Sequence, residues 1–191
     1  MRTLMTTALG LAVLAACADQ GASFLSPTTP PLFEIVDGAQ GGNRRFYFLP
    51  PMVPMPSPSG TFDGSLAPVV QVCEWTGTEC AMPLVAEYTM TTGPGSETVQ
   101  VVPGGGHYLV NWHTDQFALD PSKTYRIRVL FGLSRGELGH ADVDAVASGN
   151  ELQNVDTGAF IALKDGRTLP IKFRIEQGAV LVCPPNCNSG L

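Results

Sequence analysis

Histidine, aspartate and arginine residues alternate along two neighbouring segments at a spacing that could hold a metal ion. His140, Asp142 and Asp144 would share one face of a β-strand, and imidazole and carboxylate groups are common metal ligands. Arg126 and Arg128 alternate in the same way on the preceding segment. Arginine–aspartate pairs between neighbouring strands account for the acids without a metal. We therefore predict exposed ion pairs here, each contributing about 0–1 kcal/mol.

A second polar group surrounds the stretch YLVNWHTD (108–115). His113, Asp115 and Asp120 flank a predicted loop in which the two aspartates could bind calcium. The loop lacks a DxDxDG ligand array, and aspartate also forms turns by accepting hydrogen bonds from nearby backbone N–H groups. We interpret Asp115 and Asp120 as turn formers, and we assign no metal-binding residue.

The pentapeptide GLSRG (132–136) matches the GxSxG nucleophile elbow of serine hydrolases. That elbow needs a strand-to-helix turn in a parallel α/β sheet, followed by an acid and then a histidine. Here Glu137 and His140 follow at once, within a predicted antiparallel hairpin. We interpret the match as a coincidence and assign no catalytic residue.

Two aromatic residues are the candidates for ligand binding. Trp75 ends a predicted strand beside Cys73 and Cys80, and Tyr88 ends the next strand. Exposed aromatic rings are platforms for sugars, so Trp75 or Tyr88 on a flat surface would indicate a carbohydrate-binding module. Packing of Trp75 against a Cys73–Cys80 disulfide is the interpretation that we favour.

The composition favours many short strands. Only 15% of the 191 residues are charged, 44% are hydrophobic, and the chain has 21 Gly and 16 Pro. A disordered chain would be more charged, and a helical bundle would contain fewer Gly and Pro. The net charge of −6 comes without a basic block, which excludes the cationic stripe that nucleic-acid binding needs.

The N-terminus predicts export and lipidation. Arg2 precedes an uncharged run rich in Leu and Ala, as in a secretory signal peptide. Residues 14–17, LAAC, resemble a bacterial lipobox. This resemblance implies that residues 1–16 are cleaved and that the thiol of Cys17 becomes a thioether to diacylglycerol. The alternative is an ordinary signal peptide with a chance cysteine.

The anchor and the tether predict a place in the cell envelope. Acyl chains on Cys17 would hold the protein on a membrane. Ala18 follows the cysteine in place of the aspartate that commonly retains lipoproteins in the inner membrane, which favours the outer membrane, on its periplasmic face or at the cell surface. Residues 17–31 then form a flexible tether.

Four further cysteines predict two disulfides in an exported chain. Three pairings of Cys73, Cys80, Cys183 and Cys187 are open, and proximity favours Cys73–Cys80 and Cys183–Cys187. A zinc site is the rival interpretation, but the cysteine spacings do not match those of zinc knuckles.

Residues 32–178 predict an all-β domain, an antiparallel β-sandwich of about seven to nine strands. Residues 179–191 would add a C-terminal strand and a disulfide knuckle. The expected hairpins join 69–75 to 81–88, 97–102 to 108–113, 125–131 to 139–146, and 160–163 to 169–175 across an Asp-Gly turn. The proline-rich segment 50–60 is either an edge crossing between the sheets or a polyproline ligand.

Two patterns indicate the type of sandwich. Tyr108, Val110 and Trp112 would share an apolar face that fills the core. The stretch LDPSKTYRIRV (119–129) resembles the tyrosine corner of immunoglobulin-like and fibronectin type III-like sandwiches, which implies that the hydroxyl of Tyr125 bonds to backbone just upstream.

We therefore predict a lipid-anchored, non-catalytic envelope module without cofactor or metal. It would bind or assemble with another envelope protein and contact membrane lipid through acylated Cys17. The alternative is a carbohydrate- or peptidoglycan-binding module, and an enzyme is the less favoured interpretation. We expect no nucleic-acid partner.

Overall fold

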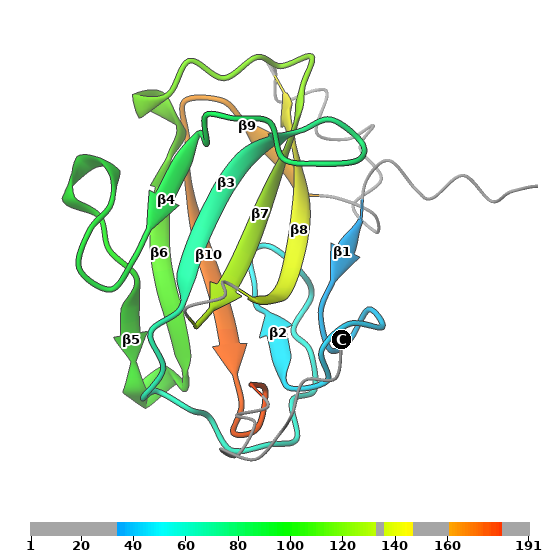
Figure 1. Ribbon diagram of the computed structural model, residues 1–191, viewed down its shortest axis with the longest axis vertical. Helices are drawn as coiled ribbons and strands as arrows, with labels where there is room; N and C mark the ends of the chain where they lie inside the picture. The colour runs from blue at the N-terminus through cyan, green and yellow to red at the C-terminus, as the bar shows by residue number, and fades with distance from the viewer. Residues whose placement is uncertain (1–33, 133–135, 147–160, 181–191) are drawn as a thin grey trace, which may run out of the picture. The chain divides into compact units, whose positions relative to one another are not determined.

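The computed structural model describes residues 34–132, 136–146 and 161–180, which contain ten strands in two packed sheets (Figure 1). The first sheet has the order β1 (Ile35–Val36), β8 (Gly136–Val146), β7 (Thr124–Phe131), β3 (Val69–Trp75) and β4 (Ala86–Tyr88), and β9 (Ile161–Lys164) also pairs with β8. The second sheet has the order β2 (Phe46–Phe48), β10 (Thr168–Ile175), β6 (His107–His113) and β5 (Gln100–Val102). The predicted β-sandwich is confirmed.

The core lies between the two sheets and is built by alternation along the strands. On β6, Tyr108, Val110 and Trp112 are at most 1% exposed, whereas the residues between them are half-buried, as the sequence predicted. On β10, Ile171 and Phe173 are fully buried. The rings of Tyr108 and Phe173 stack with their centroids 5.4 Å apart. Aromatic stacking therefore fixes β6 against β10 in the second sheet.

Three predicted hairpins form, and the fourth does not. β3 pairs with β4, β5 with β6, and β7 with β8, all antiparallel. The Asp-Gly turn was predicted to join two paired strands, but β9 runs parallel to β8 while β10 pairs with β6 and β2. The turn instead carries the chain from one sheet to the other. In the middle of the second sheet, the apolar inward face of β10 is covered by the opposing first sheet.

The strand order of the second sheet differs from that of the corresponding sheet in an immunoglobulin domain. In that fold the strand preceding the tyrosine corner pairs with an early strand of the chain, in the order A-B-E-D. Here β6 precedes the corner, and its neighbours are β5 and the late strand β10. The sandwich is thus as predicted, whereas the strand order around β6 is not that of an immunoglobulin domain.

The tyrosine corner is present at the crossing from β6 to β7. The hydroxyl oxygen of Tyr125 accepts a hydrogen bond of 2.7 Å from the backbone N–H of Asp120 and lies 3.4 Å from the Asp120 carbonyl oxygen. The Tyr125 ring packs edge-on to Trp112, with centroids 6.2 Å apart. This side chain therefore ties the crossing loop to the core.

The proline-rich segment crosses from β2 in the second sheet to β3 in the first, as the edge-crossing interpretation predicted. Met52 and Val53 are buried, whereas Met55 is 71% exposed. No helix in the described part of the chain is long and apolar enough to cross a membrane. The predicted signal peptide and tether, Cys17, and the cysteines Cys183 and Cys187 lie outside the described residues, so their predictions stay untested.

Replacing Tyr125 with Phe removes the corner hydrogen bond and leaves the ring in place. We expect the free energy of unfolding to fall by about 1 kcal/mol or more, measured by urea denaturation. Tyr88→Phe is the matched control, because Tyr88 is a core tyrosine whose hydroxyl has no hydrogen bond within the described residues. Equal stability of Tyr125→Phe and the wild type would contradict a stabilising corner.

Candidate functional site

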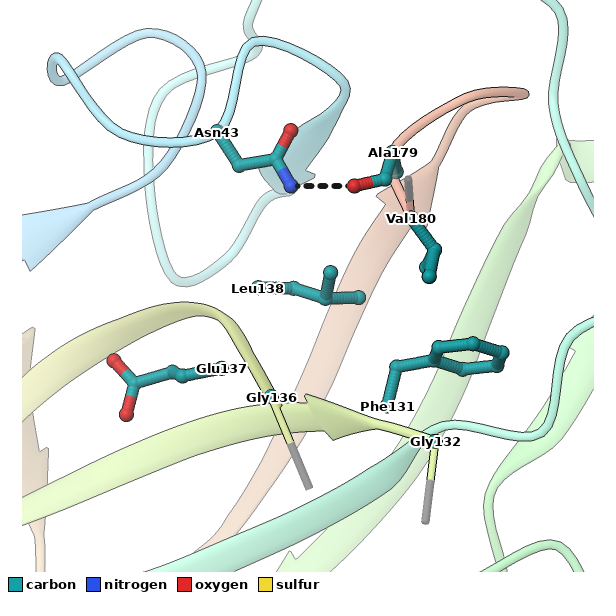
Figure 2. A pocket seen from close by; sticks show the side chains of 8 residues that line it. All are labelled: Asn43, Phe131, Gly132, Gly136, Glu137, Leu138, Ala179 and Val180. Atoms are coloured by element: carbon teal, nitrogen blue, oxygen red, sulfur yellow. Dashed lines mark hydrogen bonds between the residues drawn. The ribbon is translucent and has the colours of Figure 1, made fainter. Parts of the chain in front are cut away.

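An apolar pocket of about 330 Å³ lies where β7 turns into β8 (Figure 2). Phe131, Leu138 and Val180 surround it, and the carboxylate of Glu137 points away from it. Gly132 and Gly136, the two ends of the GxSxG match, are also lining residues, while residues 133–135 lie outside the described part. The motif therefore sits in an antiparallel hairpin and not in the strand-to-helix turn of a hydrolase.

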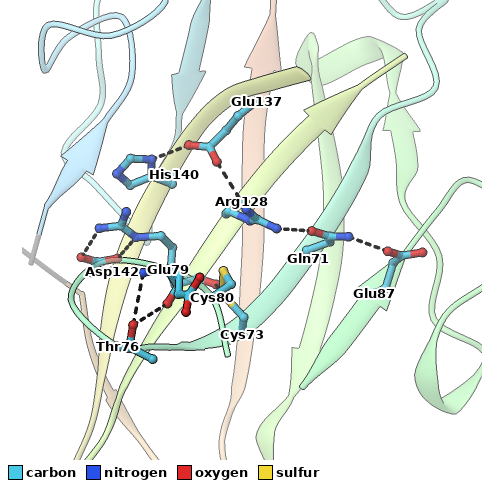
Figure 3. Close-up of a disulfide and its surroundings, with 11 residues drawn as sticks. Gln71, Cys73, Thr76, Glu79, Cys80, Glu87, Arg128, Glu137, His140 and Asp142 are labelled. Atoms are coloured by element: carbon cyan, nitrogen blue, oxygen red, sulfur yellow. Dashed lines mark hydrogen bonds and ion pairs between the residues drawn. A yellow bond between two sulfur atoms is a disulfide. The ribbon is translucent and has the colours of Figure 1, made fainter. Parts of the chain in front are cut away.

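A row of polar side chains crosses the outer face of the first sheet (Figure 3). The amide of Gln71 accepts a hydrogen bond of 2.6 Å from Arg128 and donates one of 2.6 Å to Glu87. Arg128 also lies 3.9 Å from a carboxylate oxygen of Glu137. These contacts bond four neighbouring strands to one another through their side chains.

A bidentate ion pair lies next to this row. Arg126 donates from Nε and Nη2 to the two carboxylate oxygens of Asp142, at 2.7 and 2.9 Å. The backbone N–H of Glu34 donates to the same carboxylate at 2.8 Å. The predicted cross-strand pairing is confirmed, but the predicted exposure is wrong, because the side chains of Arg126 and Asp142 are only 6% and 0% exposed.

A disulfide closes the loop that follows β3, beside Trp75. The predicted Cys73–Cys80 bond is present, and hydrogen bonds between Thr76 and Glu79 close the loop between the cysteines (Figure 3). The ring centroid of Trp75 lies 3.5 Å from Cζ of Arg126, in cation–π geometry. Trp75 thus covers one side of the buried guanidinium, and the guanidinium in turn occupies one face of the indole.

Tyr88 cannot act as a surface platform. Its side chain is 1% exposed in the core, which corrects the expectation that it could be exposed. Burial, with a smaller contribution from the charge of Glu97, raises the pKa of Tyr88 above its ordinary value. The ring faces the sandwich interior because Tyr88 lies on the inward side of β4, opposite Val70 of β3.

His140 lies between two carboxylates. Its Nδ1 is 2.5 Å from Glu137 and its Nε2 is 2.8 Å from Glu34. Burial raises the pKa of Glu137, but the hydrogen bond and charge of His140, with Arg128, outweigh it and leave this pKa below its ordinary value. Both ring nitrogens are engaged, so neither is left to accept a proton from a substrate.

His113 is held in a similar way on the other sheet. Its Nε2 lies 3.0 Å from Glu97, and its Nδ1 lies 2.9 Å from the hydroxyl of Thr168. Asp120 accepts hydrogen bonds from the backbone and hydroxyl of Ser122, as predicted for a turn former, and these lower its pKa. Within the described ranges, no three His, Cys, Asp or Glu side chains are grouped closely enough to hold a metal ion.

A second pocket, of about 370 Å³, lies on the outer face of the second sheet, where the sequence predicted no site. We call it the cationic pocket, and its polar lining consists of His107, Lys172 and Arg174. The signal was present in the alternation of PIKFR, which places Lys172 and Arg174 on the face opposite the core. The sequence does not show, however, that the proline-rich segment lies beside Lys172 and Arg174.

Comparison of this chain with protein-family models, with curated proteins and with solved structures gave no match.

The Arg126–Asp142 pair provides a test of the buried network. Asp142→Asn removes the bidentate partner of the buried guanidinium and leaves only the carboxylate of Glu34, 3.8 Å from Nη2, as its countercharge. We expect the free energy of unfolding to fall by about 3–5 kcal/mol in urea denaturation. Replacing both residues, as Arg126→Met with Asp142→Leu, should restore most of that loss because no unpaired charge remains.

Lys123→Met is the control, since it breaks an exposed pair with Glu74 and should change stability little. If Asp142→Asn lowers the free energy of unfolding no more than Lys123→Met does, the buried ion pair does not contribute more to stability than an exposed one.

Proposed function

We propose that the protein is a bacterial envelope lipoprotein, anchored through acylated Cys17, whose β-sandwich is a non-catalytic module that binds or assembles with another envelope protein. The lipobox resemblance of residues 14–17 supports the anchor, and Ala18 favours the outer membrane. The tether of residues 17–31 would let the module reach its partner from the membrane surface.

One observation carries the binding role. The side chains that could do chemistry, such as His140, Asp142 and His113, are bonded to neighbours in the fold and do not converge on either described pocket. The accessible features are instead an apolar pocket and a cationic pocket on the surface. Such surfaces suit recognition of another molecule better than bond making or breaking.

The carbohydrate-binding alternative depends on Trp75. Its ring is partly exposed, but the guanidinium of Arg126 covers one face. If the free face stacks on a sugar, the full-length protein should sediment with insoluble peptidoglycan or a polysaccharide, and Trp75→Ala should abolish this without unfolding. If Trp75→Ala sediments as much as the wild type, Trp75 does not contribute to glycan binding.

Cys17→Ser tests the anchor. We expect this variant to leave the membrane fraction, because it cannot receive the acyl chains, whereas Ala18→Ser keeps the cysteine and should stay in that fraction. Fractionation with immunoblotting measures the outcome. Retention of processed Cys17→Ser in the membrane would contradict the lipoprotein assignment.

Crosslinking of the wild-type protein in intact cells tests the binding role. A discrete protein adduct that is enriched from the envelope and identified by mass spectrometry would support it. Absence of any protein adduct, together with glycan sedimentation that depends on Trp75, would favour the carbohydrate module instead.

A further inference from the structure

The cationic pocket lies between three elements of the second sheet's outer side. β10 supplies Lys172 and Arg174, the start of β6 supplies His107, and the proline-rich crossing supplies Met55 and Pro58. Its volume of about 370 Å³ falls within the range of ligand-binding pockets. One wall is therefore apolar and another carries basic side chains.

Arg174 holds two walls of this pocket together. Its Nη1 donates to the carbonyl of Gly106 in the β5–β6 turn, and its Nη2 donates to the carbonyl of Gly60 at the end of the proline-rich crossing, both at 2.8 Å. Glu176 is 1% exposed, lies 3.4 Å from Nε of Arg174 and accepts a hydrogen bond of 2.7 Å from the N–H of Gly60. The pocket is thus preformed, which reduces the entropy lost on binding.

The charge left over in the pocket is positive. Glu176 balances Arg174, but the side-chain ammonium of Lys172 has no hydrogen bond or ion pair within the described residues. The pocket lining there contains no acidic residue, although the chain as a whole carries a net charge of −6. A free ammonium beside an apolar wall favours a ligand that joins a negative group to a hydrophobic one.

We propose that the cationic pocket binds the acidic side chain of an extended peptide segment of the partner, with an adjacent apolar residue packed on Met55 and Pro58. Basic side chains are the usual receptors of acidic motifs, whereas terminal carboxylates are held in backbone N–H nests. Here the N–H of Gly106 already bonds the carbonyl of Pro103. The described lining contains no Phe, Tyr or Trp ring on which a sugar could stack, which disfavours a sugar.

The test measures peptide binding to the purified full-length protein by fluorescence polarisation. The probe is a labelled peptide with blocked ends and the sequence Ser-Leu-Glu-Leu-Ser. We expect saturable binding that weakens about tenfold or more when Glu in the probe is replaced by Gln, and by a similar factor in Lys172→Met. Lys164→Met, on β9 and outside the pocket, makes the same charge change and should stay within about twofold of the wild type.

Two further variants separate binding from folding. Lys172→Arg retains the charge and should retain binding. Met55→Ser removes an exposed side chain, so the melting temperature should not change, while binding should weaken about threefold. A third peptide, Ser-Leu-Gln-Leu with a free C-terminal carboxylate, tests whether the pocket binds a C-terminal carboxylate instead of a side-chain carboxylate.

Four outcomes would overturn the proposal: no saturable binding, equal binding of the Gln peptide, unchanged binding in Lys172→Met, or binding of the free-carboxylate peptide alone. The proposal rests on the proposed binding role, since it names the chemistry of the partner. The two proposals can fail independently. If crosslinking in cells gives protein adducts but the peptides do not bind, the pocket proposal is rejected and the proposed envelope partner is not.

Discussion

β10 passes through the middle of the second sheet, and its alternating side chains serve two parts of the molecule at once. The inward residues, among them Ile171 and Phe173, fill the space between the sheets and stack against β6. The outward residues Lys172 and Arg174 line the cationic pocket. Since a shift of one residue would exchange these two faces, the core holds the pocket residues in register.

The outer face of the first sheet differs from that of the second because it contains a buried ion pair. It carries Arg126 and Asp142 in a buried pair, although removing two charges from water is expensive unless their hydrogen bonds are satisfied. The bidentate geometry, the backbone N–H of Glu34 and the ring of Trp75 meet that requirement. The Cys73–Cys80 disulfide closes the loop beside Trp75. The Arg126–Asp142 pair is thus satisfied by groups of the protein itself, whereas Nε of Arg128, in the neighbouring row, is buried without a hydrogen-bond partner among the described residues.

The Arg126–Asp142 pair and the cationic pocket lie on opposite sides of the sandwich. On the first sheet this pair is buried, whereas on the second the ammonium of Lys172 has no partner among the described residues and lines the pocket with the exposed Met55. If the module binds a partner as proposed, the second sheet would supply the binding surface and the first sheet a rigid support. An N-terminal lipid anchor with a tether would set such a surface away from the membrane.

The sequence by itself determined the local features, because they depend on neighbours along one strand or one turn. These were the strand positions, the inward set Tyr108, Val110 and Trp112, the nearby disulfide and the corner hydrogen bond of Tyr125. Tertiary structure alone decided that β9 and β10 separate into different sheets, that the Arg126–Asp142 pair is buried and that Tyr88 lies in the core. It also formed the cationic pocket, whose walls come from residues more than a hundred positions apart. Period-two alternation states which residues share a face, but only the packed sheets decide which face is covered, and by what.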